Sequence, residues 1–235
     1  MYKSEKLGLE YEELAHKILY FPKASTDPAE TISYLESRPE EWYENASEWN
    51  ELLGGPARHD CHVEFPNQEE ADIVTEVFKT FCDKYDETLK DERVRTRGYS
   101  RGDVEYNAAR YRLGGEAKNH VDQPTPEDIG LLNICIYLNE DYEGGELGFV
   151  LDEDRKHDNA KPNLEKDLMY TPKSGDILVF PGHFWHYALP TKKGTKYLVL
   201  IKTMVEREGL DAEYVGVDED GVQMNDYMSD DRASS

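Results

Sequence analysis

The residues best suited to chemistry in this chain are His120, Asp122 and His186. The segment His120-Val121-Asp122 places an imidazole and a carboxylate two positions apart, and residues two apart on a β-strand project from the same face. Two imidazoles and one carboxylate hold Fe(II) on one side and leave the opposite side open. The pattern predicts that His120 and Asp122 bind one ion together and that a distant strand supplies the third ligand.

The distant histidine lies in the segment PKSGDILVFPGHFWHYALPTKKGTKYLVL. Residues 176–180 predict a strand, and Lys196 begins the next strand after a turn. His186 and His183 both follow the first strand and compete for the role of third ligand. Only His186 stands four positions before Pro190 and ten positions before Lys196, and we therefore prefer His186.

Lys196 is the second unusual residue of this segment. Strand alternation puts Lys196, Leu198 and Leu200 on one face and the intervening residues on the other. A lysine on the inward face of a barrel is costly unless an anion neutralises it. The pattern therefore predicts a buried cation near the iron ligand, ready for an anionic group.

The secondary structure that must position these residues is predicted to change from helices to strands along the chain. Residues 1 to about 55 predict polar helices. Residues 67–89 predict an amphipathic helix, with one apolar stripe made of Ile73, Val77, Phe78, Phe81 and Tyr85. After Arg95 come short runs rich in Val, Ile, Leu and Tyr, separated by turn residues. We therefore expect an α+β domain with helices packed outside a β-barrel or sandwich.

This pattern divides the chain into three stretches. Residues 1–95 are expected to form a helical support region, and residues 96–205 the β core of the same domain. Residues 206–235 form an acidic stretch with little to bury and are predicted to be a loosely held tail. The charged stretch 152–167 predicts a loop, placed at the mouth of the barrel.

Composition limits the partners. The 235 residues include 50 acidic and 27 basic side chains, a formal net charge of -23, which argues against binding to a phosphate backbone. No stretch approaches the ~18 to 20 apolar residues that span a bilayer, and the first residues lack the apolar core of a signal peptide. An odd number of cysteines at unrelated spacings, Cys61, Cys82 and Cys135, suits a reducing cytoplasm. We expect a cytoplasmic protein with no nucleic-acid or membrane partner.

Four segments between about residues 109 and 204 resemble one enzyme family. They are RYRLGGEAKNHVD, ICIYLNEDYEGGELGF, SGDILVF and HYALPTKKGTKY. Together they resemble the prolyl 4-hydroxylase-like branch of the 2-oxoglutarate and Fe(II)-dependent dioxygenases. The resemblance implies a double-stranded β-helix, also called a jelly-roll or cupin-like barrel, and an iron centre held by His120, Asp122 and His186.

The resemblance also implies roles around the cosubstrate. Lys196 takes the place of the basic residue that binds the distal carboxylate of 2-oxoglutarate, and Tyr137 takes the place of a tyrosine that often shares it. Tyr111 corresponds to a tyrosine that lines the cosubstrate pocket. Both tyrosines can equally be packing aromatics. The chain departs from the family at Ala117, where relatives often carry tyrosine, which puts substrate contacts at this position in doubt.

The implied activity is hydroxylation of a C–H bond with consumption of O2 and 2-oxoglutarate, release of succinate and CO2, and ascorbate as an accessory reductant. The first substrate expected is a prolyl residue in a peptide or protein. Alternatives are a free amino acid, a small metabolite, or a cupin-like module that binds metal without turnover. A nucleobase demethylase is disfavoured, because that branch uses two arginines where this chain offers Lys196 and Lys202, and because the chain is acidic.

One other metal site is conceivable in the segment RHDCHVEF, where His59, Cys61 and His62 cluster. Nothing downstream completes a Cys/His set for zinc. The sequence therefore favours the iron centre.

Overall fold

A computed structural model describes residues 1–44, 58–64, 68–85, 94–96, 105–122, 130–157 and 160–205. Two α-helices in these residues are α1 (Pro28–Glu36) and α2 (Gln68–Tyr85). Short 3-10 helices lie at Pro39–Glu41 and Glu153–Arg155. The strands are β1 (Tyr2–Lys3), β2 (Glu10–Ala15), β3 (Ile18–Phe21), β4 (Tyr43–Glu44), β5 (Arg58–Glu64), β6 (Val94–Thr96), β7 (Glu105–Tyr111), β8 (Ala117–His120), β9 (Gly130–Tyr137), β10 (Glu143–Gly144), β11 (Leu147–Phe149), β12 (Leu168–Tyr170), β13 (Ile177–Pro181), β14 (His186–Ala188), β15 (Thr191–Lys193) and β16 (Lys196–Val205).

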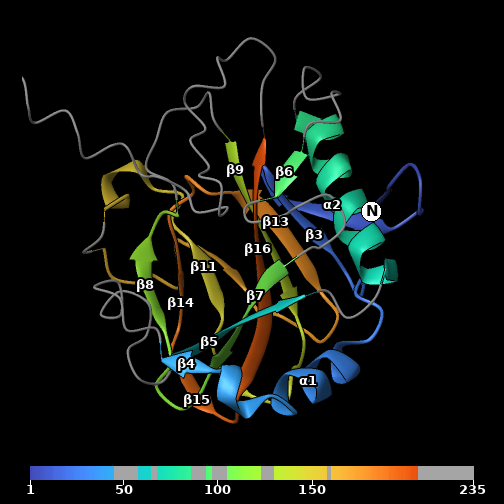
Figure 1. Ribbon diagram of the computed structural model, residues 1–235. Coiled ribbons are helices and arrows are strands. Elements are labelled where there is room, and N and C mark those ends of the chain that lie inside the picture. Colours follow the sequence, from blue (N-terminus) through green and yellow to red (C-terminus); the bar gives the residue numbers. More distant parts are fainter. Residues whose placement is uncertain are drawn as a thin grey trace, which may run out of the picture.

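The strands form two main sheets. The larger has the order β1-β2-β3-β13-β9-β16-β7-β5-β4, with β6 paired to β16, and the smaller has the order β12-β11-β14-β8. Strands β10 and β15 pair separately. The long strand β16 runs through the middle of the larger sheet, between β9 and β7 (Figure 1). The sheets face each other without closing into a barrel, so the expected barrel or sandwich takes the form of an open two-sheet sandwich.

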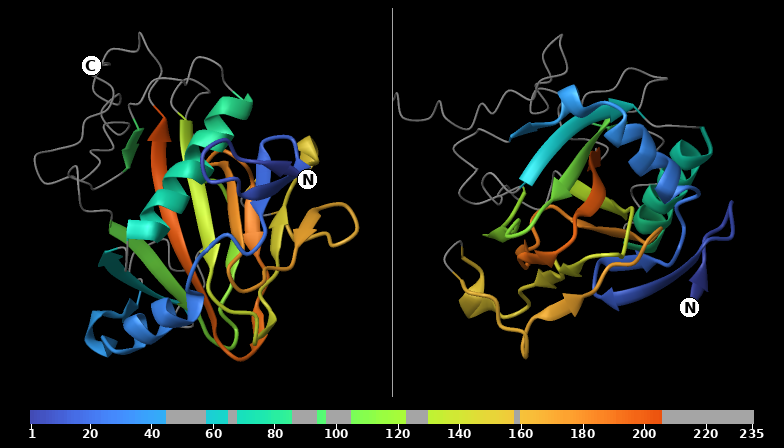
Figure 2. Two further views of the ribbon diagram at one scale, coloured as in Figure 1. Left: turned by 90° about the vertical axis from the view of Figure 1, so that its right-hand side faces the viewer. Right: turned by 90° about the horizontal axis from the view of Figure 1, so that it is seen from below.

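The larger sheet has an apolar layer on each face. Its inner face packs against the smaller sheet through side chains such as Phe180 and Leu198 on one side and Leu147 and Phe149 on the other. Its outer face packs against α2, which lies across the sheet (Figure 2, left). The predicted apolar stripe of this helix is confirmed, since it contributes Ile73, Val77, Phe78 and Phe81 to the outer core. Helix α2 therefore supports the sheet from the side opposite the candidate site.

The strands predicted after Arg95 are confirmed. The runs VEYNAARYRL, IGLLNICIYLNE, GELGFV, DILVF and KYLVLIKTMV contain β7, β9, β11, β13 and β16, respectively. The alternation along β16 is confirmed too, because Lys196 and Leu198 face the inside of the sandwich while Val199 and Ile201 join the outer core. Alternation predicts these faces well because each face is buried against a different layer.

The prediction of polar helices for residues 1 to about 55 is wrong for most of the described part of this stretch. Only α1 and one 3-10 turn are helical, whereas β1, β2 and β3 form a meander that joins the larger sheet. Lys17, at a φ of 62°, makes the turn between β2 and β3. The buried run Ile18–Phe21 pairs with β13, and this long-range pairing overrides the helical preference of the Glu- and Leu-rich sequence around it.

Other predictions have mixed outcomes. The described residues of the charged stretch, 152–157 and 160–167, form the predicted loop with one 3-10 turn, and the guanidinium of Arg155 anchors it to the buried carboxylate of Asp167. The predicted tail, 206–235, lies outside the described residues. The boundary between residues 95 and 96 stays a prediction, although strands from both sides of it share the larger sheet. Among the helices described, none has the length and apolar character needed to cross a membrane.

Candidate active site

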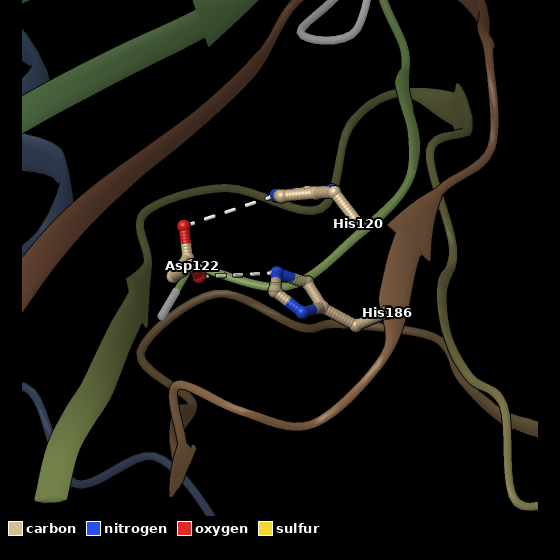
Figure 3. A group of neighbouring side chains, drawn as sticks. All are labelled: His120, Asp122 and His186. Atoms are coloured by element: carbon tan, nitrogen blue, oxygen red, sulfur yellow. Dashed lines mark ion pairs between the residues drawn. The ribbon is translucent and has the colours of Figure 1, made fainter. Parts of the chain in front are cut away.

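Two neighbouring strands of the smaller sheet bring the predicted ligands together. His120 ends β8 and His186 begins β14, and the two residues are register partners in this antiparallel pair. Nε2 of His120 lies 3.8 Å from Oδ1 of Asp122, and Nε2 of His186 lies 3.4 Å from Oδ2. Figure 3 shows both imidazole rings turned toward the carboxylate. The three donor atoms lie within 4.8 Å of one another, so one ion can contact all three.

Backbone carbonyl groups orient both imidazole rings. Nδ1 of His120 lies 2.7 Å from the carbonyl oxygen of Lys118, and Nδ1 of His186 lies 2.8 Å from that of Phe184. In each ring Nδ1 therefore carries the hydrogen and donates it, which leaves the lone pair of Nε2 directed at the shared centre. This is the tautomer that a metal ligand requires.

Asp122 lies just beyond the end of β8, so the expectation that it shares a strand with His120 is wrong. Its backbone N–H donates to the carbonyl oxygen of Gly182 at 2.9 Å, which holds the chain close to β14 after the strand ends. The carboxylate accepts hydrogen bonds from the amide of Asn133 and the ammonium of Lys202, both at 2.7 Å. Asp122 is therefore placed by contacts from outside its own strand.

Burial and neighbouring charges determine the protonation of His120 and Asp122. Burial, together with the neighbouring His186, lowers the pKa of His120 to about 4. Burial alone would raise the pKa of Asp122, but Lys202 and the two imidazoles outweigh it and hold this pKa well below its usual range. At neutral pH His120 is uncharged and Asp122 is ionised, which are the forms that bind a metal ion.

The same cavity contains the predicted buried cation. A cavity of about 220 Å³ is lined by the three ligands and by Lys196. Lys196 is 2% exposed, and its ammonium donates to the carbonyl oxygen of Gly145 at 2.7 Å. Burial lowers the pKa of Lys196 to about 8. Within the described part of the chain no carboxylate forms an ion pair with this ammonium, so the cavity presents a positive charge that an anionic ligand can neutralise.

The two predicted tyrosines lie beside Lys196. The ring centres of Tyr111 and Tyr137 each lie 5.4 Å from its Nζ atom, and both side chains line the cavity and are buried. Burial raises the pKa of Tyr111 to about 12 and that of Tyr137 well above its ordinary value. Both phenols therefore stay protonated and can donate a hydrogen bond to a bound carboxylate.

Several cavity residues were not assigned to the site from the sequence. Arg58 and Asp60 lie on β5 and form a buried ion pair at 2.9 Å. Asn107 lies on β7, and its buried side-chain oxygen has no hydrogen-bond partner among the residues described. Lys202 and Asn133 are register partners on β16 and β9. Each of these five residues lines the cavity. The two-residue alternation along β16 and β9 places Lys202 and Asn133 on the cavity-facing side of these strands, so the sequence could have indicated them. No comparable pattern in β5 indicates that Arg58 and Asp60 face the cavity.

The competing residues are not part of the cluster. His183 is exposed and packs edge-on against Phe184, and it is absent from the cavity lining. Cys61 is buried in the outer core, while the side chain of His62 lies outside the described residues. Over the described ranges, only His120, Asp122 and His186 gather as three possible metal ligands. Ala117, the departure from the family pattern, lines the cavity and leaves space there.

The donor set fits a ferrous ion. Two imidazole nitrogens and one carboxylate oxygen converge on one point, and the cavity opens beside them. This is the arrangement of mononuclear non-haem Fe(II) sites that bind a cosubstrate and dioxygen. The fold and the site therefore define the class, a β-sandwich with a 2-His-1-carboxylate metal centre.

One family model matches the part of the chain that contains the candidate site. Residues 106–201 match the family model described as the 2OG-Fe(II) oxygenase superfamily. The match agrees with the resemblance to the 2-oxoglutarate and Fe(II)-dependent oxygenases, a family that uses Fe(II), 2-oxoglutarate and O2. No functionally curated protein matches the chain significantly.

Solved structures confirm the jelly-roll, double-stranded β-helix fold. A prolyl-4-hydroxylase from Pseudomonas putida superposes with a TM-score of 0.50 at 19% identity, covering 77% of this chain and 85% of the other. A prolyl hydroxylase from Trichoplax adhaerens, in complex with a hypoxia inducible factor peptide fragment, gives 0.54 at 14% identity, covering 80% and 84%. A viral collagen prolyl hydroxylase from Paramecium Bursaria Chlorella virus-1 gives 0.50 at 15% identity, covering 80% and 96%.

Proposed function

We propose that this protein is an Fe(II)- and 2-oxoglutarate-dependent dioxygenase that hydroxylates a C–H bond, with a prolyl residue of a peptide or protein as the first candidate substrate. One observation carries the proposal: a preformed 2-His-1-carboxylate cluster and a buried lysine without a carboxylate partner line the same cavity. When bound, iron and 2-oxoglutarate supply the oxidising chemistry from dioxygen, with succinate and CO2 as co-products.

The residues of the chain have separate tasks in this reaction. His120, Asp122 and His186 would hold the metal. Lys196 would bind the far carboxylate of 2-oxoglutarate, with Tyr137 donating a hydrogen bond to the same group. The apolar walls of the sandwich exclude water from the reacting centre.

The pairing of charges in the cavity supports an uncharged substrate group. Arg58 is paired with Asp60, and Lys196 would bind the cosubstrate. A free amino acid brings an ammonium and a carboxylate, and burying them there requires partners that are already engaged. A prolyl residue within a peptide brings neither charge.

Asn107 adds support for a peptide. Its amide offers hydrogen-bond donors and an acceptor, whichever way the group is turned, and its oxygen lacks a partner in the described part of the structure. A peptide bond offers the complementary N–H and carbonyl groups.

The acidic chain and the reduced cysteines Cys61, Cys82 and Cys135 are consistent with our proposals that nucleic acid and membranes are not partners and that the protein works in the cytoplasm.

The test of this function is succinate production. The purified protein is incubated with Fe(II), ascorbate and 2-oxoglutarate, first alone and then with pools of acetylated, amidated proline peptides or of free amino acids. We expect slow succinate formation alone, faster formation with a peptide, and a mass gain of one oxygen on that peptide. A gain on free amino acids would change the substrate class. No succinate under any condition would favour a cupin-like module that binds metal without turnover.

A further inference from the structure

The carboxylate of Asp122 has two partners besides the histidines. The ammonium of Lys202 donates to Oδ1 and the side-chain amide of Asn133 donates to Oδ2, each at 2.7 Å. The two donors come from adjacent strands, because Lys202 on β16 is the register partner of Asn133 on β9. Both oxygens of the carboxylate are therefore held from the larger sheet, while the two histidines belong to the smaller sheet.

The two partners differ in charge. The side chain of Asp122 is 13% exposed and that of Lys202 is 31% exposed, so this ion pair lies at the cavity rather than on the open surface. Lys202 is the cation that pairs directly with Asp122 before any metal binds. Asn133 is 3% exposed and uncharged, and it can orient the carboxylate without balancing its charge.

These contacts have opposite consequences for a metal ion. We propose that Lys202 is the resident counter-ion of Asp122: it stabilises the metal-free centre and weakens metal binding, whereas Asn133 strengthens metal binding by orienting the carboxylate. A divalent metal ion that binds Asp122 replaces Lys202 as the cation that balances the carboxylate. The nearby ammonium of Lys202 then repels the metal ion. A neutral donor causes no such repulsion, and donors to a ligating group usually favour the metal by 10- to 100-fold, roughly. The proposal rests on the metal centre proposed above.

The test measures metal affinity without catalysis. Co(II) serves as a spectroscopic probe, and its dissociation constant is determined by visible absorption and by calorimetry without 2-oxoglutarate. The variants are Lys202→Met, which removes the charge, Lys202→Arg, which keeps it, and Asn133→Leu, which removes the neutral donor. Lys193→Met is the matched control, because Lys193 pairs with Glu143 on the exposed surface.

We expect Lys202→Met to bind Co(II) about 10-fold more tightly than the natural chain and to melt at a lower temperature when metal-free. Lys202→Arg should stay within about threefold, since the charge is kept. Asn133→Leu should bind Co(II) about 10-fold more weakly, and Lys193→Met should change neither property. Equal or weaker binding by Lys202→Met would overturn the counter-ion role.

Two further outcomes remain informative. If Lys202→Met is unfolded without metal, the proposal requires that excess Co(II) restores its fold, and a failure to restore it contradicts the proposal. If the natural chain itself binds no Co(II), the metal centre is wrong and both proposals fall. Tight binding by the natural chain, combined with weaker binding by Lys202→Met, removes the counter-ion role alone.

Discussion

The two ends of the cavity differ in how their polar groups are satisfied. At the metal end, Asp122 contacts Lys202 and Asn133, and each imidazole donates to a backbone carbonyl. At the other end, Lys196 has a single hydrogen bond to a carbonyl oxygen. One end is nearly complete before anything binds, whereas the ammonium at the other end has no ion-paired carboxylate among the described residues.

This difference suggests how the site is prepared for its ligands. Groups that must keep a fixed geometry around a metal are held by the protein, because a small displacement there is costly. A group that binds an anionic cosubstrate is left without a counter-charge, because an internal carboxylate would compete with the cosubstrate. The unneutralised charge of Lys196 costs stability in the free protein and favours cosubstrate binding.

The largest expected effect comes from removing a ligand at the metal end of the cavity. His186→Ala removes one of three ligands and should lower the affinity for Fe(II) or Co(II) by at least about 100-fold. Far-UV circular dichroism should be unchanged, because the strand pairing of β14 uses backbone groups. The metal content per chain after dialysis measures the effect.

His183→Ala is the matched control for that experiment, since this histidine lies three positions before His186 but does not line the cavity. It should retain the natural metal content. Loss of metal in the control, with retention in His186→Ala, would reverse the assignment of the third ligand.

Removing the charge of Lys196 should have the next largest effect. Lys196→Met keeps most of the length of the side chain and removes its charge, so the Michaelis constant for 2-oxoglutarate should rise about 100-fold, as expected for an uncompensated buried carboxylate. The affinity for Co(II) should change less than about threefold, because the metal end is built separately. An unchanged requirement for 2-oxoglutarate would remove the proposed role of Lys196.

The same two ends show how far the sequence predicts the site. His120, Asp122, His186 and Lys196 are recognisable because their types and spacing are unusual together. The contact of Lys202 with Asp122 needs more information, since it depends on how the end of β8 lies against β16. Alternation along β16 predicts the face of Lys202 but not its partner.

The least predictable part of the cavity comes from the first third of the chain. Arg58 and Asp60 reach the cavity because β5 pairs with β7, and no local pattern indicates a pairing between residues so distant in sequence. The helical prediction for residues 1 to about 55 fails for the same reason, because β3 is determined by β13. By contrast, α2 and the strands β7, β9, β11, β13 and β16 have strong local patterns, and the sequence predicts them.

A smaller effect tests whether Lys196 really bears an uncompensated charge. Its pKa is about 8 in the folded protein and near 10.5 when exposed, so the unfolded chain binds the proton more tightly between these pH values. Stability contributed by this group therefore rises as the pH increases from about 8 to 10.5. The free energy of unfolding of the natural chain, relative to Lys196→Met, should rise by roughly 1 to 3 kcal/mol over this range without cosubstrate.

Chemical denaturation at pH 7 and pH 9.5 measures this difference, and the comparison with Lys196→Met cancels the titration of the tyrosines. Saturating 2-oxoglutarate should abolish the pH dependence, because its carboxylate stabilises the ammonium. A difference that is flat with pH in the free protein would show that Lys196 is already neutralised.

The smallest expected effect separates the two tyrosines beside Lys196. Both rings lie at the same distance from the ammonium. Tyr111 differs from Tyr137 in lying also against Arg58, whose guanidinium carbon is 5.3 Å from its ring centre. The ring of Tyr111 therefore contacts a second cation, whereas the ring of Tyr137 packs against that of Tyr170, with ring centres 6.0 Å apart. Tyr137→Phe should raise the Michaelis constant for 2-oxoglutarate about 10-fold, the value of one hydrogen bond to a charged group, and should leave the melting temperature unchanged. Tyr111→Phe should raise that constant less than threefold, because the phenyl ring keeps the stacking on Arg58. Equal effects of the two variants would mean that both hydroxyls bind the carboxylate, and the Lys196 end would then have three ligand-binding groups to match the three at the metal end.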